Sequence, residues 1–449
     1  MHFHTKQVNM LEGPLTGKIV RFAIPLACAS VLQQLFNSAD LAVIGRFENA
    51  TAMAAVGSNA AIVSLLVSLF SGLSLGSNVT VASLIGMKKH EEVNRAVHTC
   101  VALSLICGVI ICVLGEVIAP QILKVTSVPA NVLPLATLYL RILFFALPFL
   151  IIYDFGSSVL RAKGDSTRPL YVLFVSGIMN VILNIIFVAL FHLSVAGVAI
   201  ATMISNMFSA FTILFFLRHE EPEFMISMKK LRIEKQYLKR IIGIGAPAGI
   251  QGMVFSLSNV IIQAGINSFG ANYIAANTAA LNFETMGYYV INAFGQAATT
   301  FTSQNFSAKL YDRCKRIYRI AIVIGMSSTF VLSMIFWFGR APFMSFFTTS
   351  ETVMKIGYIR LMIIDNFELL TGTYEIPGGC LRGMGHSLIP AIITMIGSCV
   401  FRVIWVSTIF VSQHTLPMLL IVYPISWVIC GTAMHIAYFT MRHKLFKQA

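Results

Sequence analysis

The sequence predicts an all-α polytopic membrane protein with twelve transmembrane helices, arranged as two six-helix bundles related by a parallel internal repeat. Three observations support this fold class. The 449 residues are 57% hydrophobic and only 11% charged, whereas soluble domains average roughly 25% charged residues. Apolar stretches long enough to cross a bilayer as a helix, about 20 residues, recur along the whole chain. Finally, one ten-residue motif occurs twice, at an offset of about 222 residues.

Hydropathy and turn residues place the twelve spans in order along the chain. Those of the first half lie near 18–44, 53–85, 93–118, 133–158, 169–190 and 196–217, and those of the second half near 238–267, 273–305, 315–338, 354–380, 387–411 and 416–440. We predict an N-terminal bundle over 1–217, a cytoplasmic linker over 218–240, which is the most charged hydrophilic segment, and a C-terminal bundle over 241–449.

The net charge of +14 is concentrated on one side of this topology. Most Lys and Arg residues lie before the first span, in every second loop, or in the C-terminal tail. By the positive-inside rule these segments are cytoplasmic, and so are both termini. The charge therefore reflects topology, and we expect no nucleic-acid partner. No HExxH and no GxxxxGK[ST] motif occurs, so we predict neither an enzyme nor a nucleotide-driven pump.

The first span carries a polar face inside an otherwise apolar helix. Within residues 19–45 the polar side chains follow one another at steps of three, four and three, and these are Ser30, Gln33, Asn37 and Asp40. Such spacing places all of them on one face. A carboxylate inside a membrane costs roughly 2.5–3.5 kcal/mol on insertion scales, so we interpret Asp40 as functional. The alternative is that Asp40 lies close enough to the helix end to reach interfacial water.

The internal repeat pairs prolines, asparagines and a whole loop. Pro25 matches Pro247, and Asn37 matches Asn259, while LRAKGDSTRP (160–169) returns as LRGMGHSLIP (381–390). Six spans per copy is an even number, so both copies enter the membrane with the same orientation. Parallel repeats of this kind, related by an axis along the membrane normal, are typical of transporters that work by alternating access.

These residues resemble the multidrug and toxic compound extrusion (MATE) transporters, of the prokaryotic DinF-like kind. The resemblance rests on Pro25, the NSAD of 37–40, the two repeated loops, and Gln304-Asn305 followed by AKLYDRCKR. It implies two six-helix bundles that export amphiphilic organic cations, including xenobiotic drugs, in exchange for H⁺ or Na⁺. It further implies a multi-pass protein of a prokaryotic plasma (inner) membrane, with small amphiphiles and membrane lipid as partners. We expect a monomer without a cofactor beyond the coupling ion.

A cation-coupling site is expected in the first bundle. Asn180 and Asn184 lie one turn apart on the fifth span, and Thr202 lies on the sixth. Together with Asp40 they offer one carboxylate and several neutral oxygens, which suit a hard cation. By resemblance, Asp40, Asn180 and Thr202 match the family's ion site, whereas several proton-coupled relatives carry an aspartate in place of Asn184. We therefore expect H⁺ or Na⁺ at Asp40 and no resident metal. Ordinary interhelical hydrogen bonding is the alternative for the uncharged members.

The substrate cavity is predicted from polar and acidic positions at membrane depth, because carboxylates beside apolar walls attract lipophilic cations. The candidates are Gln33, Asn37, Glu284, Tyr288 and Glu368. Asp365 and Glu368 would repel each other if both were ionised, so one is expected to hold a proton. Alternatively, Asp365 pairs with Arg360 or Arg402. By resemblance, Phe255 stands where some Na⁺-linked relatives carry a glutamate.

Two further acids lie at equivalent places in the repeat. Asp154 and Glu375 each precede a loop arginine, Arg161 or Arg382, by seven residues. We predict gating or structural pairs there. The alternative function is a flippase for a lipid-linked precursor within the same superfamily. It would require a strongly basic cavity, and the mainly acidic deep positions argue against it.

Overall fold

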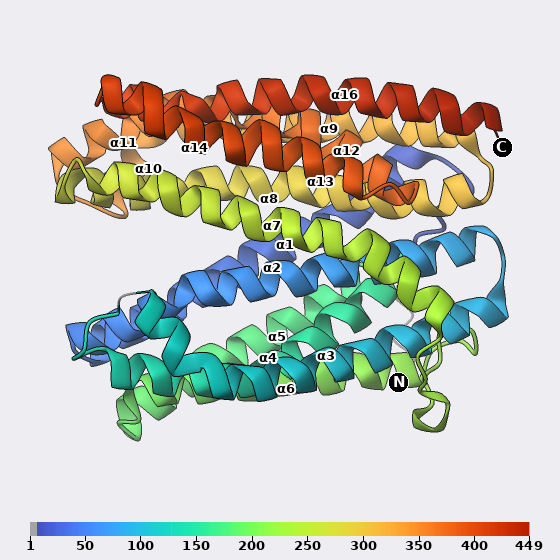
Figure 1. Cartoon of the computed structure of the whole chain (residues 1–449), viewed down its shortest axis with the longest axis horizontal. Helices are drawn as coiled ribbons and strands as arrows, with labels where there is room; N and C mark the ends of the chain where they lie inside the picture. Colours follow the sequence, from blue (N-terminus) through green and yellow to red (C-terminus); the bar gives the residue numbers. More distant parts are fainter. Residues whose placement is uncertain (1–6, 127, 449) are drawn as a thin grey trace. The chain divides into compact units, whose positions relative to one another are not determined.

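The computed structural model describes residues 7–126 and 128–448, and this part of the chain contains helices and connections but no strand (Figure 1). The helices of the first half are α1 (Leu15–Phe47), α2 (Ala50–Gly86), α3 (His90–Val125), α4 (Leu133–Lys163), α5 (Thr167–Ile185) with the π-helix η1 (Ile186–Leu190), and α6 (Ser194–Arg218). The short 3₁₀ helix η2 (Met228–Lys230) lies in the connection to the second half.

The second half begins with the long helices α7 (Lys235–Asn267), α8 (Ala271–Ser307) and α9 (Tyr311–Phe338). The remaining elements are α10 (Arg340–Ser345), α11 (Glu351–Ile363), η3 (Asp365–Thr371), α12 (Gly372–Gly383), α13 (Leu388–Thr394), η4 (Met395–Val400), α14 (Phe401–Trp405), η5 (Val406–Phe410), α15 (Leu416–Leu420) and α16 (Val422–Gln448). The predicted all-α fold class is confirmed.

In the part of the chain that the structure describes, ten helical segments are long and apolar enough to cross a membrane. They correspond to all predicted spans except the eighth and the tenth. The eighth forms the 37-residue helix α8, which carries Asn277, Asn282 and Glu284 and is too polar for an apolar span. The tenth, predicted as one helix over 354–380, is instead interrupted by the 3₁₀ helix η3 between α11 and α12. The eighth span therefore differs in its polarity, and the tenth in the break that leaves α11 and α12 with 13 and 12 residues.

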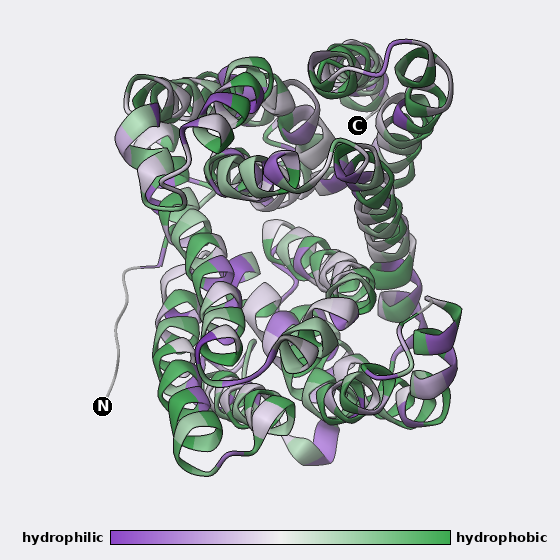
Figure 2. Cartoon of the chain, turned by 90° about the vertical axis from the view of Figure 1, so that its left-hand side faces the viewer, coloured by the Kyte–Doolittle hydropathy of each residue, from purple (hydrophilic) through white to green (hydrophobic). Residues whose placement is uncertain are grey.

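Apolar side chains face outward on the long helices, as a lipid environment requires. On α3, Val109, Val113 and Val117 follow one another at steps of four and are 63%, 59% and 65% exposed. Figure 2 shows hydrophobic residues along the helices and hydrophilic residues mainly in the connections and at isolated helical positions. A soluble protein rarely exposes such a continuous apolar stripe. The chain is a multi-pass membrane protein.

The chain forms two compact units, and each contains part of α1 and part of α7. The first consists of Cys28–Ala246 together with Gln7 and Val8, and the second of Asn9–Ala27 and the chain from Pro247 onward. The changes of unit therefore fall beside Pro25 and at Pro247, inside α1 and α7. Proline removes one helical hydrogen bond, which permits a kink at these places. The domain boundaries predicted from the repeat are 1–217, 218–240 and 241–449. They stay a prediction.

The glycine that the two repeated loops share has a conformational reason. Gly164 and Gly385 occupy the same place in the two motifs and both have a positive φ, +107° and +91°. Residues with a Cβ rarely adopt this backbone conformation, so glycine ends the preceding helix in each copy. A Cβ on Gly164 would also lie 2.4 Å from the carbonyl oxygen of Val8, whereas a Cβ on Gly385 would meet nothing within 4 Å.

We therefore expect Gly164→Ala to destabilise the protein more than Gly385→Ala. Both variants place alanine in a left-handed conformation, at a cost of roughly 1–2 kcal/mol. Only Gly164→Ala adds a clash with Val8. The measurement is the thermal unfolding midpoint of each purified variant in detergent, with wild type as reference. Equal midpoints for the two variants would contradict this explanation.

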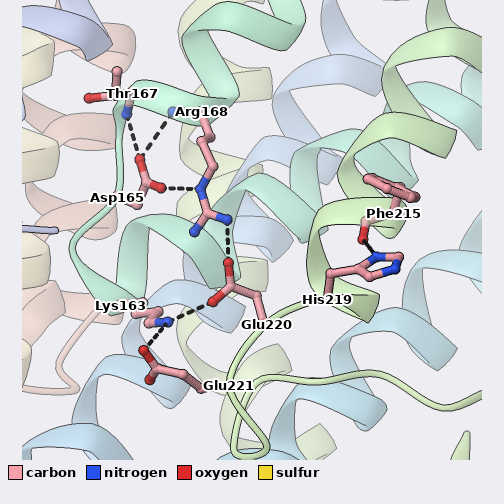
Figure 3. Close-up of polar contacts among 8 residues, drawn as sticks. All are labelled: Lys163, Asp165, Thr167, Arg168, Phe215, His219, Glu220 and Glu221. Atoms are coloured by element: carbon pink, nitrogen blue, oxygen red, sulfur yellow. Dashed lines mark hydrogen bonds and ion pairs between the residues drawn. The ribbon is translucent and has the colours of Figure 1, made fainter. Parts of the chain in front are cut away.

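Buried ion pairs fix the first repeated loop to the end of α6 (Figure 3). The backbone N–H groups of Thr167 and Arg168 donate to the Asp165 carboxylate at 2.9 and 3.0 Å, at the start of α5. The Arg168 guanidinium pairs with Asp165 and with Glu220. Lys163 Nζ lies 2.6 Å from the Glu220 carboxylate, and both side chains are about nineteen-twentieths buried. The beginning of the connection from α6 to α7 is therefore held against the first unit.

The Gln304-Asn305 motif docks the N-terminal segment within the second unit. Asn305 is fully buried, and its Nδ2 donates to the carbonyl oxygen of Met10 at 3.0 Å. Arg313 donates to Asn305 Oδ1 at 2.9 Å and to the carbonyl oxygens of Met10 and Gly13 at 3.1 Å. The motif thus satisfies backbone carbonyls that precede α1, which is a structural function.

Candidate functional site

The site predicted around Asp40 lies inside the first unit, where α1, α5 and α6 meet. A close approach of α1 and α5 brings its members together. The Phe36 ring lies directly on Gly177, where an added Cβ would be only 1.8 Å from a ring carbon. Glycine at this position therefore allows the polar face of α1 to reach the polar face of α5.

Hydrogen bonds join all members of the predicted cation-coupling set. Asn184 Nδ2 donates to Asp40 Oδ1 at 2.5 Å and to Asn180 Oδ1 at 3.2 Å. Asn180 Nδ2 in turn donates to Thr202 Oγ1 at 3.4 Å. Asn180 and Asn184 are 6% and 0% exposed. The structure thus brings together residues that are more than 140 positions apart in the sequence.

A cavity of about 80 Å³ adjoins this chain of hydrogen bonds. A single water needs roughly 10–15 Å³, so the cavity has room for several waters or a partly hydrated ion. Its polar lining comes from α1, α4, α5 and α6 and includes Gln33, Asn37, Asp40, Tyr153, Ser176, Asn180, Thr202, Ser205, Asn206 and Ser209. Asp40 is the only carboxylate among these lining residues. Gln33 and Asn37, predicted for the substrate cavity, therefore lie beside Asp40 and are exposed.

Two buried oxygens at this place have no hydrogen-bond partner. They are Asn184 Oδ1 and Ser205 Oγ. A buried acceptor without a partner carries a desolvation cost, which a cation or an ordered water would remove. The donor set of one carboxylate with amide and hydroxyl oxygens therefore fits a proton or a hard monovalent cation.

Among the polar residues of the cavity wall, sequence reasoning missed Tyr153 and two serines. Ser176 is 4% exposed and Ser205 is 5% exposed, and both line the cavity. Ser176 precedes Asn180 and Asn184 at steps of four, which places the three on one face of α5. That spacing was a usable signal, and Ser205 offers a similar one, because it follows Thr202 by three positions and precedes Ser209 by four on α6.

In the second unit, Glu284 is held in a buried ion pair. Arg360 donates to Glu284 Oε2 from Nε at 3.0 Å and from Nη2 at 2.6 Å. Arg360 also donates to Asn277 Oδ1 at 2.6 Å, and its guanidinium lies 5.6 Å from the Tyr423 ring centre. The alternative pairing of Asp365 with Arg360 is therefore not the observed one. Glu284 is an ion-pair partner, and its predicted place in the substrate cavity stays a prediction.

Asp365 and Glu368 lie in η3, where 3₁₀ geometry places residues three apart directly above each other. They are 1% and 2% exposed. Both Asp365 oxygens and Glu368 Oε2 have no hydrogen-bond partner. A Cβ on Gly287 of α8 would lie 3.1 Å from Glu368 Cγ, so Glu368 packs against α8 one residue before Tyr288. These two acids are the free carboxylates of this region, and their cavity function stays a prediction.

Arg402 is the most deeply buried arginine, at 1% exposure. It donates to Ser426 Oγ at 3.2 Å and to Asn259 Oδ1 at 3.4 Å, and it lies 4.2 Å from the Tyr423 ring centre. Its Nη2 has no partner. Within the described residues no carboxylate lies within ion-pair distance of Arg402, so the alternative pairing with Asp365 is also not observed.

The predicted gating pair of Glu375 and Arg382 has ion-pair geometry. Arg382 Nη1 lies 3.7 Å from the Glu375 carboxylate, and Nη2 donates to Gln251 Oε1 at 3.1 Å. The equivalent Asp154 accepts a hydrogen bond from Ser71 Oγ at 3.4 Å. The gating function predicted for Asp154, Arg161, Glu375 and Arg382 stays a prediction. Over residues 7–126 and 128–448, no group of three or more His, Cys, Asp or Glu could hold a metal.

This chain combines a repeated membrane-spanning helical fold with a polar cavity inside one unit. That combination is typical of membrane transport proteins. Comparison with known families agrees. The MatE family model matches residues 25–186 and 247–406, which is more than half of the chain. The chain therefore belongs to the MatE family, as the sequence motifs predicted. The two matched segments begin at Pro25 and Pro247, the residues that the internal repeat pairs.

The probable multidrug resistance protein YoeA of Bacillus subtilis is 28% identical over 381 residues, covering 83% of this chain and 82% of the relative. Among solved structures, an outward-facing multidrug resistance MATE family transporter has a TM-score of 0.91 at 22% identity over 99% of each chain. A MOP superfamily transporter from Pyrococcus furiosus, described as having a binding pocket of reversed polarity, has a TM-score of 0.90 at 22% identity over 98% of this chain and 99% of that one. These structures establish the shared fold.

Proposed function

We propose that the protein is a secondary active antiporter, which exports amphiphilic organic cations and drugs in exchange for H⁺ or Na⁺. The observation that carries this proposal is the hydrogen-bonded chain from Asp40 to Thr202 beside the 80 Å³ cavity. Family membership and a relative named as a multidrug resistance protein support the export of drugs. The protein lies in the cytoplasmic membrane of a prokaryote, with both termini on the cytoplasmic side.

The proposed coupling uses the charge of Asp40. An ionised carboxylate in this poorly solvated place is costly, so binding of H⁺ or Na⁺ stabilises the ion-loaded state. Asn184 donates a hydrogen bond to Asp40. When the ion leaves, this hydrogen bond stabilises the ionised carboxylate of Asp40. Ion loading and ion release therefore favour different arrangements of α1 and α5.

A route from this site to the rest of the chain runs along α1 itself. Asp40 lies on the part of α1 within the first unit, and residues 15–27 of the same helix belong to the second unit. Pro25 lies near the change of unit and permits bending. A rearrangement of α1 around Asp40 is thus passed along one continuous helix, which is how we propose that ion occupancy drives alternating access.

The test of this function is efflux of a fluorescent lipophilic cation from everted membrane vesicles that contain the wild-type protein. We expect one imposed gradient, of H⁺ or of Na⁺, to drive transport, and vesicles without the protein to show none. The driving gradient then identifies the coupling ion. Absence of transport under both gradients would contradict the proposal.

Arg402 is the observation that favours the alternative function, a flippase for a lipid-linked precursor. Its buried guanidinium has an unpaired Nη2 and could bind a phosphate or pyrophosphate group. A substitution of Arg402 distinguishes the two functions. A flippase loses phospholipid-analogue translocation in Arg402→Gln, whereas a cation exporter retains gradient-driven cation efflux.

A further inference from the structure

A second, larger cavity lies at the other end of the membrane-spanning helices of the first unit. Its volume is about 920 Å³. The walls are the first turns of α3, over residues 90–98, and the connection between α6 and α7, over residues 221–232. Because α3 and α7 continue into membrane spans, this cavity lies where those helices leave the bilayer.

The walls of the cavity are held by specific hydrogen bonds. Asn94 Nδ2 donates to the carbonyl oxygens of Pro222 and Met225 at 2.9 and 3.0 Å. His98 is 2% exposed, with Nδ1 2.8 Å from the carbonyl oxygen of Asn94. The N–H of Ser227 donates to His98 Nε2 at 3.0 Å, so His98 is neutral and carries its proton on Nδ1. The connection is thus attached to α3 before it forms η2.

Cations outnumber acids among the unpaired side chains of the cavity. In the described part of the chain, Arg95, Lys229 and Lys230 line the cavity with no carboxylate within ion-pair distance, and all three are exposed. Two lining acids lie beside a basic group: Glu221 is 3.1 Å from Lys163, which it shares with Glu220 (Figure 3), and Glu223 contacts His90, which is charged only when protonated. Counted by formal charge, the four lining cations, Arg95, Lys229, Lys230 and Arg232, exceed the three lining acids by one, and one of those acids has no partner.

That acid is Glu91, which lies in the first turn of α3, where the helix dipole favours it. The remaining lining cation, Arg232, is held by Glu234 at 2.6 Å. The unpaired groups therefore leave the cavity with a net positive charge, which suits an anion with a phosphate group.

Exposed apolar side chains accompany the cations on the same connection. Met225 and Met228 are 43% and 71% exposed, and Ile233 is 36% exposed. A cavity for a free, water-soluble anion has no need of apolar residues beside its entrance. Basic residues interspersed with exposed apolar ones, next to the ends of membrane helices, are typical of contact with anionic lipid.

We propose that this cavity binds the headgroup of an anionic phospholipid. Lys229, Lys230 and Arg95 bind the phosphate, and Met228 contacts the acyl region. The bound lipid anchors the connection between α6 and α7 at the membrane surface. This site is separate from the Asp40 cavity and does not depend on the proposed transport function.

The test is binding of dioleoylphosphatidylglycerol and of dioleoylphosphatidylcholine to the purified protein, measured by native mass spectrometry. We expect wild type to prefer phosphatidylglycerol and Lys229→Gln/Lys230→Gln to lose about 30-fold in affinity for it, since each basic residue contributes ~1 kcal/mol near anionic lipid. Lys444→Gln/Lys447→Gln is the matched control. It removes two exposed lysines at the end of α16, outside the cavity, and should leave the preference unchanged.

A second variant separates lipid from soluble anion. Met228→Ser keeps every charge and should weaken binding of phosphatidylglycerol without changing binding of glycerophosphoglycerol, its headgroup without acyl chains. The proposal is overturned if Lys229→Gln/Lys230→Gln retains the lipid preference, or if the control loses it equally. It is also overturned if glycerophosphoglycerol displaces the lipid at comparable concentration, which would assign the cavity to a soluble phosphate ester.

Discussion

Substitution of Asp40 by asparagine is expected to reduce gradient-driven cation efflux to the background of vesicles without the protein. Among the described residues, Asp40 is the only carboxylate that lines the 80 Å³ cavity. Asparagine preserves its size and its ability to accept the hydrogen bond from Asn184. It carries no charge, however, and so cannot exchange a proton or attract Na⁺. The measurement is efflux from everted vesicles under the gradient that drives wild type.

Glu116→Gln is the matched control for this prediction. It makes the same chemical change in the same unit, at a carboxylate that lies outside the cavity and 3.6 Å from Arg141 Nε. We expect this variant to transport at the wild-type rate. If Asp40→Asn also transports normally, Asp40 is structural. Coupling would then have to use the unpartnered acids Asp365 and Glu368 of the second unit.

Removal of the Glu284 carboxylate is expected to destabilise the second unit by about 3–5 kcal/mol. Glu284→Gln leaves the guanidinium of Arg360, which is 4% exposed, buried without its counter-ion. Arginine cannot lose its proton in a protein, so the charge persists. Arg360→Gln should cost less, because the remaining Glu284 can bind a proton. The measurement is the free energy of unfolding in mixed micelles.

The double variant Glu284→Gln/Arg360→Gln tests whether the pair acts as a unit. We expect it to be more stable than Glu284→Gln alone, since it removes both buried charges. The exposed pair of Lys355 and Glu351, at 2.8 Å in the same unit, is the control. Glu351→Gln should change stability far less than Glu284→Gln, because water solvates and screens both charges of this exposed pair. Destabilisations that simply add in the double variant would contradict an energetic coupling between Glu284 and Arg360.

Much of the fold could be predicted from the sequence because the membrane imposes a simple rule. Length and hydropathy are sufficient to identify spans whose lipid-facing sides are apolar, and the motif around Gly164 and Gly385 identifies the repeat. The eighth and tenth spans were the exceptions: α8 is more polar than an apolar span, and the tenth is not one uniform helix. In the tenth span, Asp365 and Glu368 lie in a 3₁₀ segment. Hydropathy reports no difference between an α-helix and a 3₁₀ helix.

The candidate site was predicted where residues share one helical face. Asp40, Asn180, Asn184 and Thr202 could each be selected by spacing within their own helix or by family resemblance, and the structure joins them by hydrogen bonds. Pairing between distant helices could not be predicted in the same way. Arg360 bonds Glu284, which precedes it by 76 positions, and no periodicity within one span indicates which acid an arginine will meet.

The most direct test of the central claim, that Asp40 exchanges an ion for the exported cation, is ion release by the purified protein in detergent. A lipophilic cation is added to wild type in weakly buffered solution, and released H⁺ is followed with a pH indicator while released Na⁺ is followed with an ion-selective electrode. We predict release of one of these ions by wild type and none by Asp40→Asn. Equal release by both proteins would contradict the assignment of the coupling site to Asp40.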